Sequence, residues 1–119
     1  MDWLWPLFRE FVLKEAERLE LGDSQEALRN LFLATLAGST ATLYAMEPEG
    51  DTIRFHGLAR WPLAEIPELL VDPNAFLLDR YGGGKFKCNF HHGDSFICTH
   101  NFRTYGESTY QELPDRDFS

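Results

Sequence analysis

The sequence lacks a long hydrophobic run, has only two cysteines and carries few basic residues, and each shortage excludes a class of protein. Its longest apolar stretch, residues 31–46, is interrupted at Gly38 and is shorter than the roughly 20 residues that a membrane-spanning helix needs. Two cysteines are too few for the disulfide scaffold of a small secreted domain. The 11 lysines and arginines face 19 aspartates and glutamates, whereas nucleic-acid binding depends on cations that neutralise phosphates. We expect no membrane span, no disulfide framework and no nucleic-acid partner.

The start of the chain also lacks the features of a secretory signal peptide. Met1 and Asp2 provide no basic segment, and Arg9 and Glu10 interrupt the first apolar stretch. We therefore predict a cytoplasmic protein.

The residues that are present indicate one globular domain with an uneven charge. With 119 residues, of which 44% are hydrophobic and 14% aromatic, the chain can build a single core without staples. The net charge is −8, but residues 80–103 hold four cations against one carboxylate, Asp94, so this segment carries +3 and the remainder −11. An acidic body of this kind favours a basic or neutral protein partner.

The first 38 residues predict an antiparallel helical hairpin. Apolar residues recur every three or four positions over residues 6–21, where Gly22 is the expected left-handed stop. The same spacing recurs over residues 24–37, after a capping box that begins at Asp23. The connection is short, so we expect the two helices to pack side by side.

The chain then changes to β-branched and aromatic residues, which predict strands. Residues 40–46 and 52–56 flank a turn at residues 48–51, so they form a first β-hairpin. Residues 57–72 show no clear periodicity. A short helix near residues 73–81 begins after Asp72, a typical N-cap.

A second hairpin completes the predicted fold, which is of the α+β class. The N-terminal helical hairpin of residues 1–38 packs on an antiparallel sheet of about four strands from two hairpins, with a short helix between them. The sheet-forming region covers residues 39–103. A polar tail, residues 104–119, follows, and we expect its last residues to fray. All of this belongs to one domain, residues 1–119.

The register of the second hairpin, residues 85–91 with 95–103, has two solutions. A two-residue turn would place Cys88 opposite Thr99, whereas a three-residue loop would place it opposite Cys98. The alternation of apolar residues on both strands favours the three-residue loop.

The same hairpin holds the residues that could bind a metal. Cys88, His91, Cys98 and His100, with His92 as a substitute for His91, supply the two thiolates and two imidazoles of a tetrahedral zinc site. Strand alternation, however, directs Cys88 and His91 to opposite faces, which favours buried free thiols. We expect no cofactor, with a zinc-binding structural domain as the alternative. A small thiol or hydrolytic enzyme using Cys98 and His100 is less favoured, because no third group has a defined relation to them.

The remaining candidates are interaction residues. Trp3 and Trp5 either fold back over the core or contact a partner, since tryptophan is enriched at interface centres. Lys85, Lys87 and Arg103 form the basic face of the second hairpin. We predict a small acidic, non-enzymatic protein-interaction domain of the inhibitor, immunity or anti-defence type, or a virion or assembly component. Its partner is another protein, basic in charge, or a second copy of the chain.

A helix that ends in Gly82-Gly83-Gly84, followed on a strand by Lys85, Phe86 and Lys87, resembles a short pattern in small phage and mobile-element proteins. The resemblance is confined to this segment and assigns no role to any residue. If the chain comes from a phage, as the resemblance implies, the predicted cytoplasmic location is the cytoplasm of the host cell.

Overall fold

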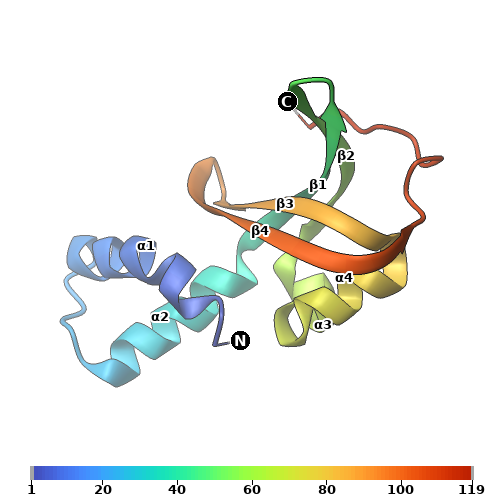
Figure 1. Ribbon diagram of the computed structural model, residues 1–119. Helices are drawn as coiled ribbons and strands as arrows, with labels where there is room; N and C mark the ends of the chain where they lie inside the picture. Colours follow the sequence, from blue (N-terminus) through green and yellow to red (C-terminus); the bar gives the residue numbers. More distant parts are fainter. Residues whose placement is uncertain (1, 119) are drawn as a thin grey trace.

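The computed structural model describes residues 2–118 and consists of helices packed on one antiparallel sheet (Figure 1). The elements in order are α1 (Trp5–Arg18), α2 (Gln25–Ala37), β1 (Ser39–Glu49), β2 (Thr52–Pro62), the 3₁₀ helix η1 (Leu63–Glu65), α3 (Pro67–Val71), α4 (Pro73–Tyr81), β3 (Gly82–His92) and β4 (Ser95–Ser108). The strand order is β2-β1-β3-β4. The predicted α+β fold, with N-terminal helices and two hairpins separated by a short helix, is confirmed.

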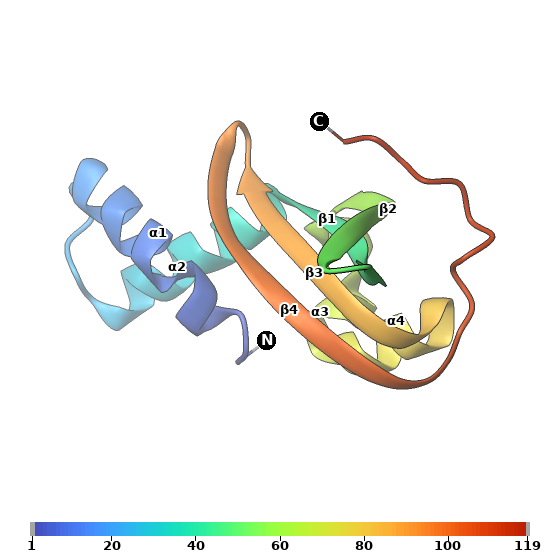
Figure 2. The ribbon, with the colours of Figure 1, turned by 45° about the horizontal axis from the view of Figure 1, so that its top comes forward.

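The helices cover one face of the sheet, which we call the inner face. Phe86, Cys88 and Phe90 of β3 point into it and are fully buried. The ring of Phe90 lies 5.6 Å from that of Phe8 in α1, and the ring of Phe86 lies 6.1 Å from that of Tyr81 in α4. The α1–α2 pair and the α3–α4 pair thus share one core (Figure 2). Alternate residues of each strand point to the opposite, outer face.

The first helix ends earlier than predicted, at Arg18. Glu20 takes the left-handed conformation, with φ of 56°, and the backbone N–H of Leu21 donates to the Ala16 carbonyl over 3.0 Å. This is a Schellman ending, so the stop lies two residues before Gly22, the residue expected from its type.

Helices α2 and α4 each begin at a residue whose side chain caps the helix. The Ser24 hydroxyl, rather than the predicted Asp23, accepts the capping hydrogen bond of α2, at 3.1 Å. The Asp72 carboxylate caps α4 as predicted, at 3.2 Å, and Gly82 ends that helix with φ of 75°.

Strand β2 continues to Pro62, well past the predicted end at residue 56. Its second half was missed because a bulge interrupts the alternation of side chains. Ala59 pairs with Leu43 and Gly57 pairs with Tyr44, which leaves Leu58 as an extra residue. The bulge shifts the alternation of side chains by one position. A sequence pattern of period two therefore breaks down where the strand continues.

A second bulge lies between β3 and β4. A two-residue turn joins them, but Phe90 pairs with Cys98 while the next residue, His91, pairs with Phe96. Ile97 is therefore the extra residue. The predicted three-residue loop is wrong, because His92 pairs with Ser95 and leaves only Gly93 and Asp94 in the turn.

Beyond this bulge Cys88 lies opposite His100. Neither predicted partner of Cys88, Thr99 or Cys98, stands across from it. The two-residue turn alone would pair Cys88 with Thr99. The extra residue, Ile97, shifts the pairing by one position, and neither predicted hairpin included a bulge.

The predicted polar tail, residues 104–119, is in part a strand, because β4 runs on to Ser108. Residues 115–118, where fraying was predicted, contact β2, and Ser119 lies outside the described residues. Tyr110 is buried against Phe86, with ring centroids 5.8 Å apart, whereas Tyr105 and Leu113 are exposed. Residues 115–118 then run along β2 (Figure 1). Within residues 2–118, no helix combines the length and apolar character needed to cross a membrane.

Candidate functional site

The outer face of the sheet brings the three predicted basic residues together. Lys85 pairs with Arg103, and Lys87 follows Lys85 by two positions on the same strand face. Lys87 also pairs with Tyr44 of β1. The two hairpins therefore converge on one surface, and the basic group borders the central strand pair of the sheet.

Aromatic rings accompany these cations. The Lys87 ammonium nitrogen lies 4.7 Å from the ring centroid of Phe55, and the Arg103 guanidinium lies 5.2 Å from that of Tyr105. Phe55 is 44% exposed and Tyr105 77% exposed. Lys14 and Arg18 of α1 and Arg54 of β2 form ion pairs with neighbouring carboxylates elsewhere in the structure. Lys87 and Arg103 each stand over an aromatic ring, a contact that favours a fixed position of the cation.

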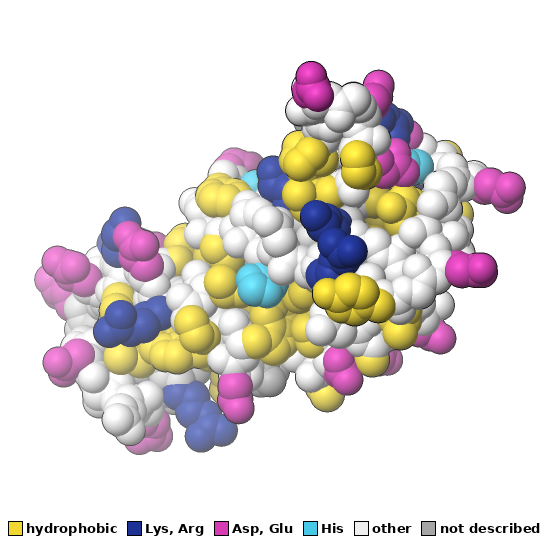
Figure 3. Space-filling model, in the orientation of Figure 1, with side chains coloured by type: hydrophobic (Ala, Val, Ile, Leu, Met, Phe, Trp, Pro, Cys, Tyr) yellow, Lys and Arg dark blue, Asp and Glu magenta, His cyan; other side chains and the backbone are white. Residues whose placement is uncertain are grey.

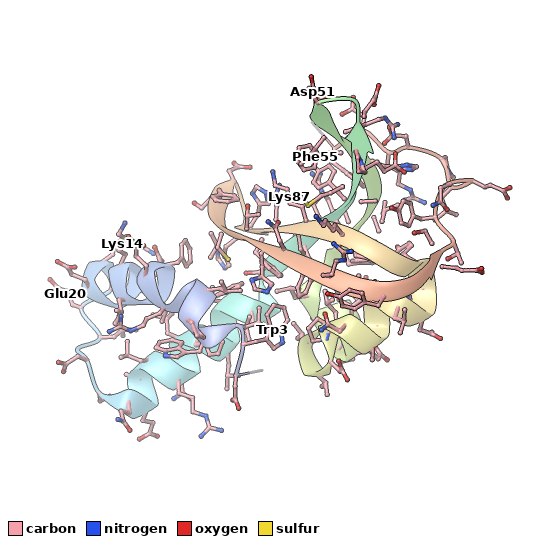
Figure 4. All side chains as sticks on the ribbon, in the orientation of Figure 1. Trp3, Lys14, Glu20, Asp51, Phe55 and Lys87 are labelled. Atoms are coloured by element: carbon pink, nitrogen blue, oxygen red, sulfur yellow. The ribbon has the colours of Figure 1, made fainter. Side chains whose placement is uncertain are left out.

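Figure 3 shows this surface as basic side chains bordered by hydrophobic ones, between the β1–β2 hairpin and β4. Figure 4 places Lys87 and Phe55 beside one another there. We call the surface formed by Lys85, Lys87, Arg103, Phe55 and Tyr105 the basic aromatic face. The sequence predicted its cations but missed both rings, because Phe55 and Tyr105 come from segments outside the predicted second hairpin.

Trp3 packs against the core, as one of its two predicted roles requires. Its indole Nε1 donates a hydrogen bond to the carbonyl oxygen of Leu70, at 2.9 Å. Its ring lies 5.5 Å from that of Phe102 and 5.7 Å from that of His100. A side chain fixed in this way ties the start of the chain to α3 and β4.

Trp5 lies in a more open position at the start of α1. Its ring meets Phe32 of α2 edge-on at 5.2 Å. It also lines an open groove of about 590 Å³ together with Leu28, Arg29 and Leu33. Trp5 therefore remains a candidate for contact with a partner, at a position separate from the basic aromatic face.

The structure does not bring the four alternative zinc ligands together. His91 lies on the outer face beside Phe96, with ring centroids 5.4 Å apart, whereas Cys88 is buried on the inner face opposite His100. His92, the predicted substitute for His91, contacts Phe11 of α1. Among residues 2–118, no three His, Cys, Asp or Glu side chains are grouped so as to hold a metal ion.

Both thiols are free and held in the protonated form. Burial raises the pKa of Cys88 far above its ordinary value, and burial raises the pKa of Cys98 to about 11. Burial also lowers the pKa of His100. A thiolate is the form that binds zinc or attacks a substrate, so this environment opposes both alternative uses of the cysteines.

One buried polar group was not expected from the sequence. His56 is 4% exposed, and its Nε2 has no hydrogen-bond partner among the described residues. Its Nδ1 lies 3.6 Å from a carboxylate oxygen of Glu47. Strand alternation places His56 and Phe55 on opposite faces, and the ring of Tyr110 packs against the imidazole, with ring centroids 6.1 Å apart.

No protein-family model, curated protein or solved structure matches the chain.

Proposed function

We propose that the chain is a non-enzymatic protein-interaction domain that binds an acidic surface or segment of another protein on its basic aromatic face. The observation that carries the proposal is the cluster of Lys85, Lys87 and Arg103, two of which stand over exposed rings, in a chain of net charge −8. Aromatic side chains and arginine are the residues that supply most binding energy at interfaces.

The charge arrangement supports an acidic protein rather than a nucleic acid. The cations form one small group, and the surrounding chain carries an excess of carboxylates. A phosphate backbone that extends past the group would meet this acidic body, whereas a protein can present a compact acidic patch matched to the group alone. The acidic body, which first suggested a basic partner, then serves to limit the choice of partners.

The test is a peptide-display selection on the immobilised full-length chain, with a triple variant as the comparison. The variant carries Lys85→Glu, Lys87→Glu and Arg103→Glu. The matched control carries Arg9→Glu, Lys14→Glu and Arg29→Glu, which change the net charge equally at exposed positions of α1 and α2.

We expect the selection to enrich acidic sequences that contain aromatic residues, and we expect these to bind the control but not the triple variant. Two results would contradict the proposal: peptides that bind the triple variant unchanged, or single-stranded RNA or DNA binding to the wild-type chain at moderate salt in preference to acidic peptides.

A further inference from the structure

The C-terminal segment, residues 114–118, forms a strap along the free edge of β2. One Asp115 oxygen accepts a hydrogen bond from the backbone N–H of Gly57, at 2.8 Å, and the other accepts from the Arg54 guanidinium. The Arg116 N–H donates to the Gly57 carbonyl at 3.0 Å. The strap therefore pairs with an edge strand at a single residue, in the manner of a short added strand.

The strap then crosses onto the outer face. The Phe118 carbonyl accepts a hydrogen bond from Arg60 at 2.9 Å, and the Arg60 guanidinium lies 4.8 Å from the Phe118 ring centroid. The Phe118 ring meets that of Tyr44 at 6.0 Å, and Tyr44 meets Phe55 at 6.4 Å. The ring of Tyr44 thus lies between Phe118 at the end of the strap and Phe55 of the basic aromatic face.

We call the surface formed by Arg54, Gly57 and Arg60, which contacts the strap, the strap site. A Cβ atom on Gly57 would stand 2.0 Å from the Arg116 carbonyl oxygen and 3.2 Å from the Phe118 ring. Arg60 is held by a second hydrogen bond, to the Thr42 hydroxyl at 3.0 Å. Two oriented arginines and a bare backbone position therefore receive a carboxylate, a peptide group and an aromatic ring.

We propose that this strap site is also a docking site for the partner, that it accepts an acidic segment containing an aromatic residue, and that the strap is its internal competitor. The proposal rests on the proposed function, because it concerns the same partner and the same side of the sheet. The strap itself shows the chemistry that the site accepts, since Asp115 and Phe118 contact Arg54 and Arg60.

A competing partner segment has one advantage over the strap. The strap pairs with β2 through the backbone hydrogen bond of Arg116 at Gly57, whereas a longer segment can pair with more of this edge strand. It must also overcome the effective concentration of a short tether, on the order of millimolar. Competition of this kind restricts binding to partners that fill both the strap site and the basic aromatic face.

The experiment measures binding of a fluorescent peptide of sequence ELPDRDF, which repeats residues 112–118, to full-length chains by anisotropy. A double variant, Asp115→Ala with Phe118→Ala, releases the strap. The same variant with Gly57→Val blocks the site. A third form, the double variant with Arg60→Glu, changes an exposed side chain and guards against misfolding of the Gly57 variant.

We expect the double variant to bind the peptide at least about tenfold more tightly than the wild-type chain does, because the internal competitor is gone. Adding Gly57→Val or Arg60→Glu should abolish that gain. The proposal is overturned if the double variant binds no more tightly than wild type, or if the gain survives Arg60→Glu. The probe does not require Lys85, Lys87 or Arg103, so this result is separate from the display selection.

Discussion

The ammonium group of Lys87 on β3 stands over the ring of Phe55 on β2, 4.7 Å from its centroid, and this contact joins the two hairpins on the outer face. An exposed cation–π contact contributes roughly 0.5–1 kcal/mol. We expect Lys87→Gln to lower the free energy of unfolding by no more than about 1 kcal/mol, while weakening the binding of acidic peptides severalfold. Urea denaturation and anisotropy measure the two effects. Lys14→Gln, on the exposed side of α1, is the control and should leave peptide binding unchanged.

Trp3 is predicted to be structural and Trp5 is not. Trp3→Phe removes the hydrogen bond from Nε1 to the Leu70 carbonyl, which leaves a half-buried acceptor unpaired and should cost about 1–3 kcal/mol of unfolding free energy. Trp5→Phe keeps an aromatic ring facing Phe32 and removes no hydrogen bond found within residues 2–118, so its cost should be smaller. Urea denaturation with an unchanged m-value tests the difference. Equal losses for both variants would contradict the assignment.

The class of fold could be predicted from the sequence because its helices and turns are marked locally. Asp72 and Gly82 bound α4 as expected, since capping and left-handed stops depend on one residue and its neighbours. The register could not be predicted, because each hairpin contains a bulge. Leu58 and Ile97 are the extra residues at two of these irregularities, and nothing in their residue types distinguishes them from regular strand positions. A further irregularity lies between Gly82 and Gly84.

The candidate surface was predicted only in part, for a related reason. The pattern of period two placed Lys85 and Lys87 on one strand face, and the bulge at Ile97 sets the register that brings Arg103 opposite Lys85. Phe55 and Phe118 come from distant parts of the chain. Their positions depend on the pairing of β1 with β3 and on the docking of the strap, which are tertiary contacts without a local signature.

Docking of the strap depends on the bare backbone at Gly57. We expect Gly57→Ala to release residues 114–118, because the new Cβ would collide with the Arg116 carbonyl oxygen. Hydrogen exchange followed by mass spectrometry should show lost protection in this segment. Gly50→Ala is the matched control: its Cβ meets no atom within 4 Å, although its φ of +63° costs about 1 kcal/mol. Unchanged protection in Gly57→Ala would refute the contact.

The thiols are expected to react slowly and in a fixed order. Because burial raises the pKa of Cys98 to about 11, its thiolate fraction at pH 8 is on the order of one in a thousand. Alkylation of the native protein by iodoacetamide should therefore be slow, accelerate as the pH rises toward 11, and modify Cys98 before the fully buried Cys88. In denaturant both should react rapidly. Fast labelling of either thiol in the native protein at pH 7 would show an activated cysteine.

The same pKa shift has a consequence for stability. The unfolded thiol loses its proton near its ordinary pKa of 9, whereas folded Cys98 holds its proton until about pH 11. Deprotonation therefore favours the unfolded state between these values. We expect the melting temperature to fall as the pH rises through this window, and Cys98→Ala to reduce that dependence. An equal dependence in the variant would contradict the assignment to Cys98.

Nuclear magnetic resonance of the full-length chain measures directly where on the sheet a partner binds. An acidic peptide obtained from the selection is titrated into the labelled protein, and backbone amide shifts are followed residue by residue. We predict that the largest shifts fall on Lys85, Lys87, Arg103 and Phe55, and that they vanish in the triple charge-reversal variant. Shifts confined to α1 and α2 around Trp5, with none on the outer face of the sheet, would contradict the account.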